Sequence, residues 1–148
     1  MANEACPLPG TSRDDEARNI ERMLQAQRIA IVGASDDPMR PSHNIAQYLQ
    51  SRGYHIIPIN PKHDEVLGEK CYPSLEAAPK PIDLVNVFRR PLACGQVARD
   101  AIAIGAKGLW LQSGIVNDEA RDLAQRAGMD FIQNRCIMIE HMNRGRCR

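Results

Sequence analysis

One short stretch of the sequence combines residue types that bind phosphate groups. It contains Gly33-Ala34-Ser35 and Arg40-Pro41-Ser42, and it ends where apolar residues begin to recur at the spacing of a helix. Glycine allows a sharp turn and a close approach of the backbone to a ligand, and the first turn of a helix offers unpaired N–H groups. Proline suits the first helical position, and arginine and serine donate hydrogen bonds to phosphate oxygens. We therefore predict a phosphate site here, at which Gly33 and Arg40 serve the ligand rather than the fold.

A second polar segment, Asn60-Pro61-Lys62, follows the next apolar run along the chain. In dinucleotide-binding domains the equivalent strand ends in an Asp or Glu that holds a free ribose diol, and the first loop carries G-x-G-x-x-G. This sequence has neither feature. A lysine at that position suits a phosphorylated ribose, which both NADP and coenzyme A (CoA) carry. Two plainer interpretations stay open at this point, in which Gly33 forms only a turn and Lys62 is a solvated surface residue.

Three further groups of residues follow the later apolar runs, and their side chains suit a nucleotide. Phe88 can stack on an adenine ring, and arginines beside it can pair with phosphates. A free cysteine with no neighbouring histidine is usually a small buried side chain, and no nucleophile–base pair or carboxylate pair is visible, so we predict no catalytic residue. The additional binding candidates are Val87, Phe88, Arg89, Arg90, Gln112, Ser113, Gly114, Asn134 and Cys136.

The composition argues against several classes of protein. Lys and Arg total 19 and Asp and Glu total 18, so no charge excess indicates binding to nucleic acid or to an anionic membrane. The five cysteines lack C-x-x-C spacing and the four histidines form no H-E-x-x-H pair, so neither a disulfide framework nor a metal site is predicted. The N-terminus has no signal-peptide pattern, and no apolar run approaches the ~20 residues of a membrane span. We expect a soluble, cytoplasmic protein.

Five short apolar runs alternate with segments of helical periodicity, which is the pattern of a parallel sheet covered by helices on both faces. Strands are expected at residues 29–32, 54–59, 82–88, 107–111 and 129–133, and helices before the first strand and after the first, third and fourth. The proline-rich residues 61–81 are expected to hold an extended piece near Cys71 and Tyr72 and one helical turn at residues 74–78. With right-handed crossovers, the pattern predicts an α/β fold, a single Rossmann-like doubly wound domain with a mostly parallel five-stranded sheet.

The sequence resembles the CoA-binding domain family, whose fold also forms the N-terminal domain of the succinyl-CoA synthetase alpha subunit. The resemblance rests on five segments in the family's order: IAIVGASDDPMRPSHNIAQYLQSRGYHIIPINP, LGEKCYPSL, IDLVNVFRRP, AIAIGAKGLWLQSGI and NRCIMIEH. It implies a Rossmann-like CoA-binding domain, which we expect at residues 13–142. Residues 1–12 are expected to form a flexible N-terminal arm, and residues 143–148 a basic tail.

The resemblance also implies CoA as the ligand and assigns each candidate group to a part of it. The turn at residues 33–35 and Arg40 would face the pyrophosphate, and residues 60–62 would border the adenosine and its 3′-phosphate. Residues 87–89 and 112–114 would line the path of the adenine and the pantetheine, and Asn134 and Cys136 would lie near the thiol end. The phosphorylated histidine of the synthetase lies in a second domain that this sequence lacks, so the resemblance supports binding and not ligase activity.

We therefore expect a protein that binds CoA or acyl-CoA without a catalytic apparatus of its own, acting as a carrier, a sensor or an accessory subunit. Two alternatives stay open, an NADP-dependent oxidoreductase and a protein-interaction module that has lost its ligand. Against the oxidoreductase, 148 residues leave little room for a substrate domain, and no Tyr-x-x-x-Lys pair is visible. A protein partner or a homo-oligomer is compatible with the sequence but is not indicated by it.

Overall fold

A computed structural model describes residues 12–144, and its centre is a five-stranded sheet. All neighbouring strands are parallel, and their order is β2-β1-β5-β6-β7. The structure confirms the α/β class and places one strand in each of the five expected runs. The strands are β1 (Arg28–Val32), β2 (His55–Ile59), β5 (Leu84–Val87), β6 (Gly108–Leu111) and β7 (Asp130–Ile132).

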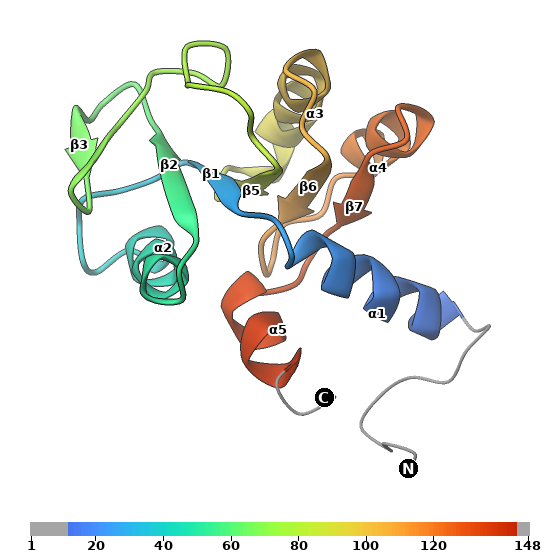
Figure 1. The fold of residues 1–148 in the computed structure, drawn as a ribbon. Coiled ribbons are helices and arrows are strands. Elements are labelled where there is room, and N and C mark those ends of the chain that lie inside the picture. Colours follow the sequence, from blue (N-terminus) through green and yellow to red (C-terminus); the bar gives the residue numbers. More distant parts are fainter. Residues whose placement is uncertain (1–11, 145–148) are drawn as a thin grey trace.

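Helices cover both faces of this sheet (Figure 1). In Figure 1, α3 and α4 lie above the sheet, and α1, α2 and α5 lie below it. The four helices expected from the sequence are present, and α5 is an additional one. Their bounds are α1 (Ser12–Met23), α2 (Pro41–Ser51), α3 (Cys94–Ala103), α4 (Asp118–Arg126) and α5 (Ile137–Arg144), and a short 3₁₀ turn, η1 (Pro91–Ala93), leads into α3.

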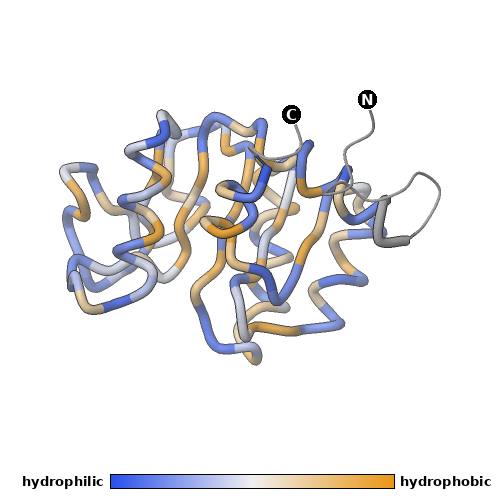
Figure 2. Tube along the Cα trace, turned by 90° about the horizontal axis from the view of Figure 1, so that it is seen from below, coloured by the Kyte–Doolittle hydropathy of each residue, from blue (hydrophilic) through white to orange (hydrophobic). Residues whose placement is uncertain are grey.

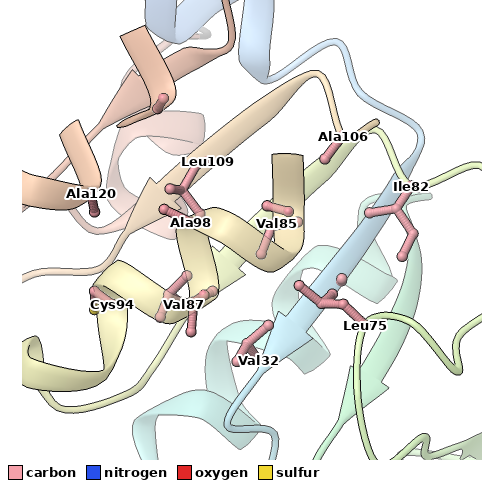
Figure 3. Packing of buried hydrophobic residues seen from close by; sticks show 14 of the residues in the cluster. Val32, Leu75, Ile82, Val85, Val87, Cys94, Ala98, Ala106, Leu109 and Ala120 are labelled. Atoms are coloured by element: carbon pink, nitrogen blue, oxygen red, sulfur yellow. The ribbon is translucent and has the colours of Figure 1, made fainter. Parts of the chain in front are cut away.

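Two hydrophobic cores fill the spaces between the sheet and its helices, because strand side chains alternate between the two faces. Val85, Leu109 and other strand residues pack under α3 and α4, where they meet helix residues such as Ala98 of α3 (Figure 3). On the opposite face, Ile31 and Trp110 pack against the helices below the sheet. The hydrophobic parts of the chain therefore follow the strands through the middle of the molecule (Figure 2).

The segment between β2 and β5 differs in detail from the expectation. It forms a small antiparallel hairpin, β3 (Glu65–Val66) and β4 (Glu69–Lys70), which the sequence pattern did not indicate. The extended piece near Tyr72 is confirmed, since Tyr72 forms a parallel bridge with Ile59. Residues 74–78 form a hydrogen-bonded turn in place of the expected helical turn, closed by the Ala78 N–H and the Leu75 carbonyl at 3.2 Å.

The termini of the domain also differ slightly from the predicted bounds. Ser12 begins α1, and Asn143 and Arg144 form the end of α5, where Arg144 pairs with Glu140 at 3.4 Å. The rest of the expected N-terminal arm and basic tail lies outside the described residues. Within residues 12–144, no helix has the length and apolar character that crossing a bilayer requires.

Candidate functional site

The direction of winding reverses between β1 and β5, and this reversal creates a crevice outside their carboxyl ends. From β1 the chain passes through α2 to β2 on one side, whereas β5 pairs with β1 on the other. Gly33 directly follows β1 and Phe88 directly follows β5, and the Phe88 N–H donates to the Val32 carbonyl at 2.8 Å. The fold therefore brings the first and third predicted groups of residues together.

Gly33 is fixed by the fold itself, so the expectation that it serves only a ligand is wrong. Its φ of +89° lies in the region that favours glycine, and a Cβ there would overlap the Phe88 carbonyl oxygen. The N–H groups of Gly33 and Ala34 both donate to the Ile59 carbonyl, at 3.0 and 3.3 Å. These two N–H groups are consequently not available to a phosphate.

Two adjoining clefts occupy this crevice and collect most of the predicted residues. The first has a volume of about 600 Å³ and the second about 770 Å³. Both are lined by Gly33, Arg40, Asn60, Lys62 and Phe88. The first cleft adds Ala34, Ser35, Pro41, Ser42, Gln112, Ser113 and Cys136, and the second adds Pro61, Arg89 and Arg90.

Three predicted residues line neither cleft. Val87 is fully buried in the core beneath α3, because the alternation of β5 turns its side chain away from the crevice, so its assignment to the ligand path is corrected. The Asn134 side-chain oxygen accepts from the Gly114 N–H at 2.8 Å, so these two residues join the loops after β6 and β7. Gly114 has a φ of +85°, a backbone conformation that favours glycine, and the space around a Cβ atom there is open. Its glycine therefore serves the turn and does not make room for a neighbouring group.

Four cationic side chains around the clefts have no carboxylate partner within residues 12–144. They are Arg40, Lys62, Arg89 and Arg90. Some arginines elsewhere are paired, such as Arg22 with Asp130 at 2.8 Å and Arg99 with Glu119 at 2.6 Å, whereas Arg52 and Arg126, which line neither cleft, have no carboxylate partner among residues 12–144. Unpaired cations close together repel one another, and an anion between them would remove this repulsion. The arrangement is suited to a ligand with several phosphate charges.

The N-terminus of α2 borders the first cleft. Within residues 12–144 the Ser42 N–H is its one backbone donor without an acceptor, because the His43 and Asn44 N–H groups donate to the Arg40 carbonyl at 3.1 and 3.3 Å. Arg40 is the N-cap with extended backbone and no side-chain capping bond, and Pro41 occupies the first turn as predicted. Ser42 is only 5% exposed, yet its hydroxyl lines the cleft and has no hydrogen-bond partner in the described part of the chain. The Oγ atom is not among the buried polar atoms that lack a partner, so it keeps contact with solvent, and a ligand oxygen could take the place of water there.

Asn60 holds the loops after β1 and β2 against each other. Its Nδ2 donates to the Ala34 carbonyl at 2.7 Å, and its Oδ1 accepts from the Lys62 N–H at 2.9 Å. Both ends of the carboxamide are therefore used within the protein. Asn60 positions Lys62 and the Gly33 turn, a role that its place in the sequence did not reveal.

Gln112 plays a similar part at the other end of the first cleft. Its side chain is 3% exposed, and its Oε1 accepts from the Ile137 N–H, the first of α5, at 3.0 Å. Cys136 precedes that helix and is partly exposed in the cleft, whereas Cys71 and Cys94 are buried. Cys136 is therefore the most accessible thiol of the described residues, and burial also raises the pKa of the Cys71 and Cys94 thiols.

Sequence reasoning missed three residues that line the first cleft, His63, Ile45 and Ile115. Ile45 and Ile115 give the cleft an apolar wall beside its polar floor. His63 follows Lys62 directly, so its place after β2 was the signal that could have revealed it. No group of His, Cys, Asp and Glu suited to a metal ion occurs among residues 12–144.

Comparison with known proteins extends this picture over most of the chain. The chain is 43% identical to the uncharacterized protein YneT of Bacillus subtilis (strain 168) over 123 residues, which cover 82% of this chain and 91% of YneT. A hypothetical protein from Pyrococcus horikoshii OT3 has a similar solved structure, with a TM-score of 0.82 and 38% identity over 95% of this chain and 97% of that one.

Larger enzymes contain a related segment. The chain is 29% identical over 141 residues to the ADP-forming acetate–CoA ligase of Methanocaldococcus jannaschii, a match that covers 88% of this chain but only 20% of the ligase. The family model described as CoA binding domain matches residues 27–142, which include all five strands of the sheet and both clefts. The chain therefore belongs to the CoA binding domain family.

Proposed function

We propose that this protein binds CoA or an acyl-CoA in the two adjoining clefts and has no catalytic apparatus of its own. In this role it would act as a carrier, a sensor or an accessory subunit. The observation that carries the proposal is the meeting of unpaired cations at the crevice with the N-terminus of α2, which has no side-chain cap. CoA carries a pyrophosphate and a 3′-phosphate on one slim molecule, which matches several separate phosphate-binding groups.

Each part of the ligand has a proposed place. The pyrophosphate lies at the N-terminus of α2, beside Arg40 and the Ser42 hydroxyl. The 3′-phosphate lies near Lys62, and the adenine extends into the second cleft along Phe88 and the adjacent arginines. The pantetheine then follows the first cleft past Ser113, and its thiol end lies near Cys136.

The proposed ligand is supported by the relatives as well as by the charges. Family membership supports CoA, and so do the names of the partial relatives, which are ligases of acetate and CoA. The chain spans a fifth of such a ligase, so the activity of those enzymes is no guide to its own. We expect the isolated chain to show no turnover of acyl-CoA, because no hydrogen bond joins the Cys136 thiol to a histidine or another base among the described residues. Robust turnover that Cys136→Ser abolishes would contradict this part of the proposal.

The experiment is native mass spectrometry of the protein as purified, followed by calorimetric titration with CoA and with dephospho-CoA. We expect the mass of a bound CoA species, and a few-fold tighter binding of CoA than of dephospho-CoA, the scale of one partly exposed ion pair. Lys62→Glu should remove or reverse this preference. Lys107→Glu, a lysine at the opposite ends of the strands, should leave it intact. Equal affinity of the wild-type protein for both ligands would contradict the role of Lys62.

A further inference from the structure

His63 lines the first cleft, with one ring nitrogen near a carboxylate and the other without a partner among residues 12–144. Its Nδ1 lies 3.6 Å from the Asp36 Oδ1, and its side chain is 25% exposed. The Nε2 atom has no hydrogen-bond or ion-pair partner among residues 12–144. The contact joins the loop after β1 to the loop after β2, beside the N-terminus of α2. The ring thus lies within ion-pair range of a carboxylate, but beyond hydrogen-bond distance, at the place where we propose that phosphate binds.

The chemistry of imidazole decides what such a ring offers to an anion. A neutral imidazole has one N–H group and one lone pair. With the N–H group at Nδ1, facing the Asp36 carboxylate, the lone pair lies on Nε2. A lone pair repels a phosphate oxygen, whereas a second proton turns Nε2 into a charged donor. An anion in the cleft therefore favours the doubly protonated ring.

We propose that His63 is an ionisable ligand for the pyrophosphate, which takes up a proton from solvent when the nucleotide binds. This inference rests on the proposed function, since it requires a phosphate ligand in the first cleft. The pyrophosphate is the relevant group because His63 lines the first cleft together with Ser35, Pro41 and Ser42, and does not line the second. Affinity for the ligand then falls as the pH rises through the range in which histidines titrate.

Other charged groups surround His63, and their contributions must be separated from its own. Asp36 contacts it from the loop after β1, Arg40 lines the same cleft, and Lys62 and Asp64 flank it in the chain. Among these residue types only histidine ordinarily changes its charge between pH 6 and 8. His43 in the first turn of α2 is the competing histidine, with its Nδ1 2.9 Å from the Ser35 carbonyl oxygen.

The test uses dephospho-CoA, because the 3′-phosphomonoester of CoA itself titrates near pH 6. Calorimetric titrations between pH 6 and 8, in two buffers with different ionisation enthalpies, measure the protons taken up on binding. We expect proton uptake near pH 7 and a roughly three- to tenfold weaker affinity at pH 8 than at pH 6. His63→Gln should abolish the uptake and flatten this pH dependence. His55→Gln, at the opposite end of β2, should change neither.

A second variant tests the role of the carboxylate. Asp36→Asn should reduce the proton uptake, because the Nδ1 position no longer has to carry the proton in the neutral ring. Uptake that persists in His63→Gln, or that His43→Gln removes instead, would overturn the inference. Binding by the wild-type protein without any proton uptake would overturn the inference alone. Absence of any binding of CoA and dephospho-CoA at every pH would overturn the proposed function together with it.

Discussion

Gly33 and Phe88 lie so close together that no side chain fits between the ends of β1 and β5. A Cβ atom at Gly33 would overlap the Phe88 carbonyl oxygen and lie 3.3 Å from the Arg89 Cδ. This close approach sets the spacing of the two loops from which Arg40 and Arg89 extend. Gly33 therefore serves the ligand only indirectly, by keeping the β1 and β5 loops in place.

Replacement of Gly33 by alanine should destabilise the protein more than the same change at another glycine with positive φ. Gly53 is the matched control, because its φ is +94° but the space around a Cβ is open. Gly53→Ala should cost about 1–2 kcal/mol for the left-handed backbone. Gly33→Ala should cost roughly a further 1–3 kcal/mol for the overlap with Phe88. Urea denaturation measures both, and equal losses would show that the backbone at Phe88 relaxes freely.

Arg40→Ala should weaken CoA binding without destabilising the protein that has no ligand. The guanidinium has no partner within the described residues, so its removal breaks no internal contact. A charged hydrogen bond to phosphate is worth about 1.5–3 kcal/mol, which calorimetry would detect as a loss of affinity. Arg99→Ala removes an arginine that pairs with Glu119, remote from the clefts, and should leave the affinity unchanged. An unchanged affinity in Arg40→Ala would refute the pyrophosphate assignment.

Asp83 should make the stability depend on pH in acid. Burial by itself would raise the pKa of this carboxyl, but hydrogen bonds from the Arg28 and Gln27 N–H groups, both 3.0 Å long, and the nearby Lys107 and Arg28 charges hold it below its usual value. A carboxyl with a lowered folded-state pKa stabilises the fold above the unfolded value of about 3.9, and this contribution disappears as the pH falls through the folded-state pKa.

Asp83→Asn should therefore be less stable than the wild-type protein at pH 7, by about 1 kcal/mol for the lost charge assistance. The difference should shrink in acid, once the wild-type carboxyl is protonated too. Urea denaturation at pH 7 and pH 3 measures this change. A stability difference of the same size at both pH values would contradict the account.

Cys136 should be the first thiol of the described residues to react with iodoacetamide. Cys71 and Cys94 are buried, and burial raises the pKa of both thiols, so they hold less of the reactive thiolate. Peptide mapping of partly alkylated protein measures the order of reaction. Bound CoA should slow the alkylation of Cys136, whose side chain lines the first cleft. Equal rates with and without CoA would place the thiol end of the ligand elsewhere.

The sheet could be predicted from the sequence because its strands are apolar on both faces and each is followed by a loop of polar, glycine or proline residues. The helix α5 could not, since it has eight residues and only Ile137 of them is buried. The β3–β4 hairpin consists of two-residue strands, which are too short to show an alternating pattern. Short elements of this kind show no clear hydrophobic periodicity in the sequence, because contacts with neighbouring elements stabilise them more than an apolar face of their own.

Most of the candidate site could be predicted because a doubly wound fold places ligands after its strands. The roles of individual side chains within it depended on contacts between distant segments. Asn60 bonds to Ala34 and Gln112 bonds to the N–H of Ile137, and neither partner is adjacent in the sequence. The prediction that Val87 lines the ligand path was wrong, because a strand turns alternate residues to opposite faces. Val87 lies in the core, and the next residue, Phe88, lines both clefts.

The measurement that tests the central claim most directly is a calorimetric comparison of CoA with NADP and NAD on the purified protein. NADP shares an adenosine phosphate with CoA but lacks the pantetheine arm, which we assign to the first cleft between Gln112 and Cys136. The account predicts that CoA binds more tightly than NADP, and that NAD binds most weakly, because Asn60 offers no carboxylate to a ribose diol. Tighter binding of NADP than of CoA would contradict it.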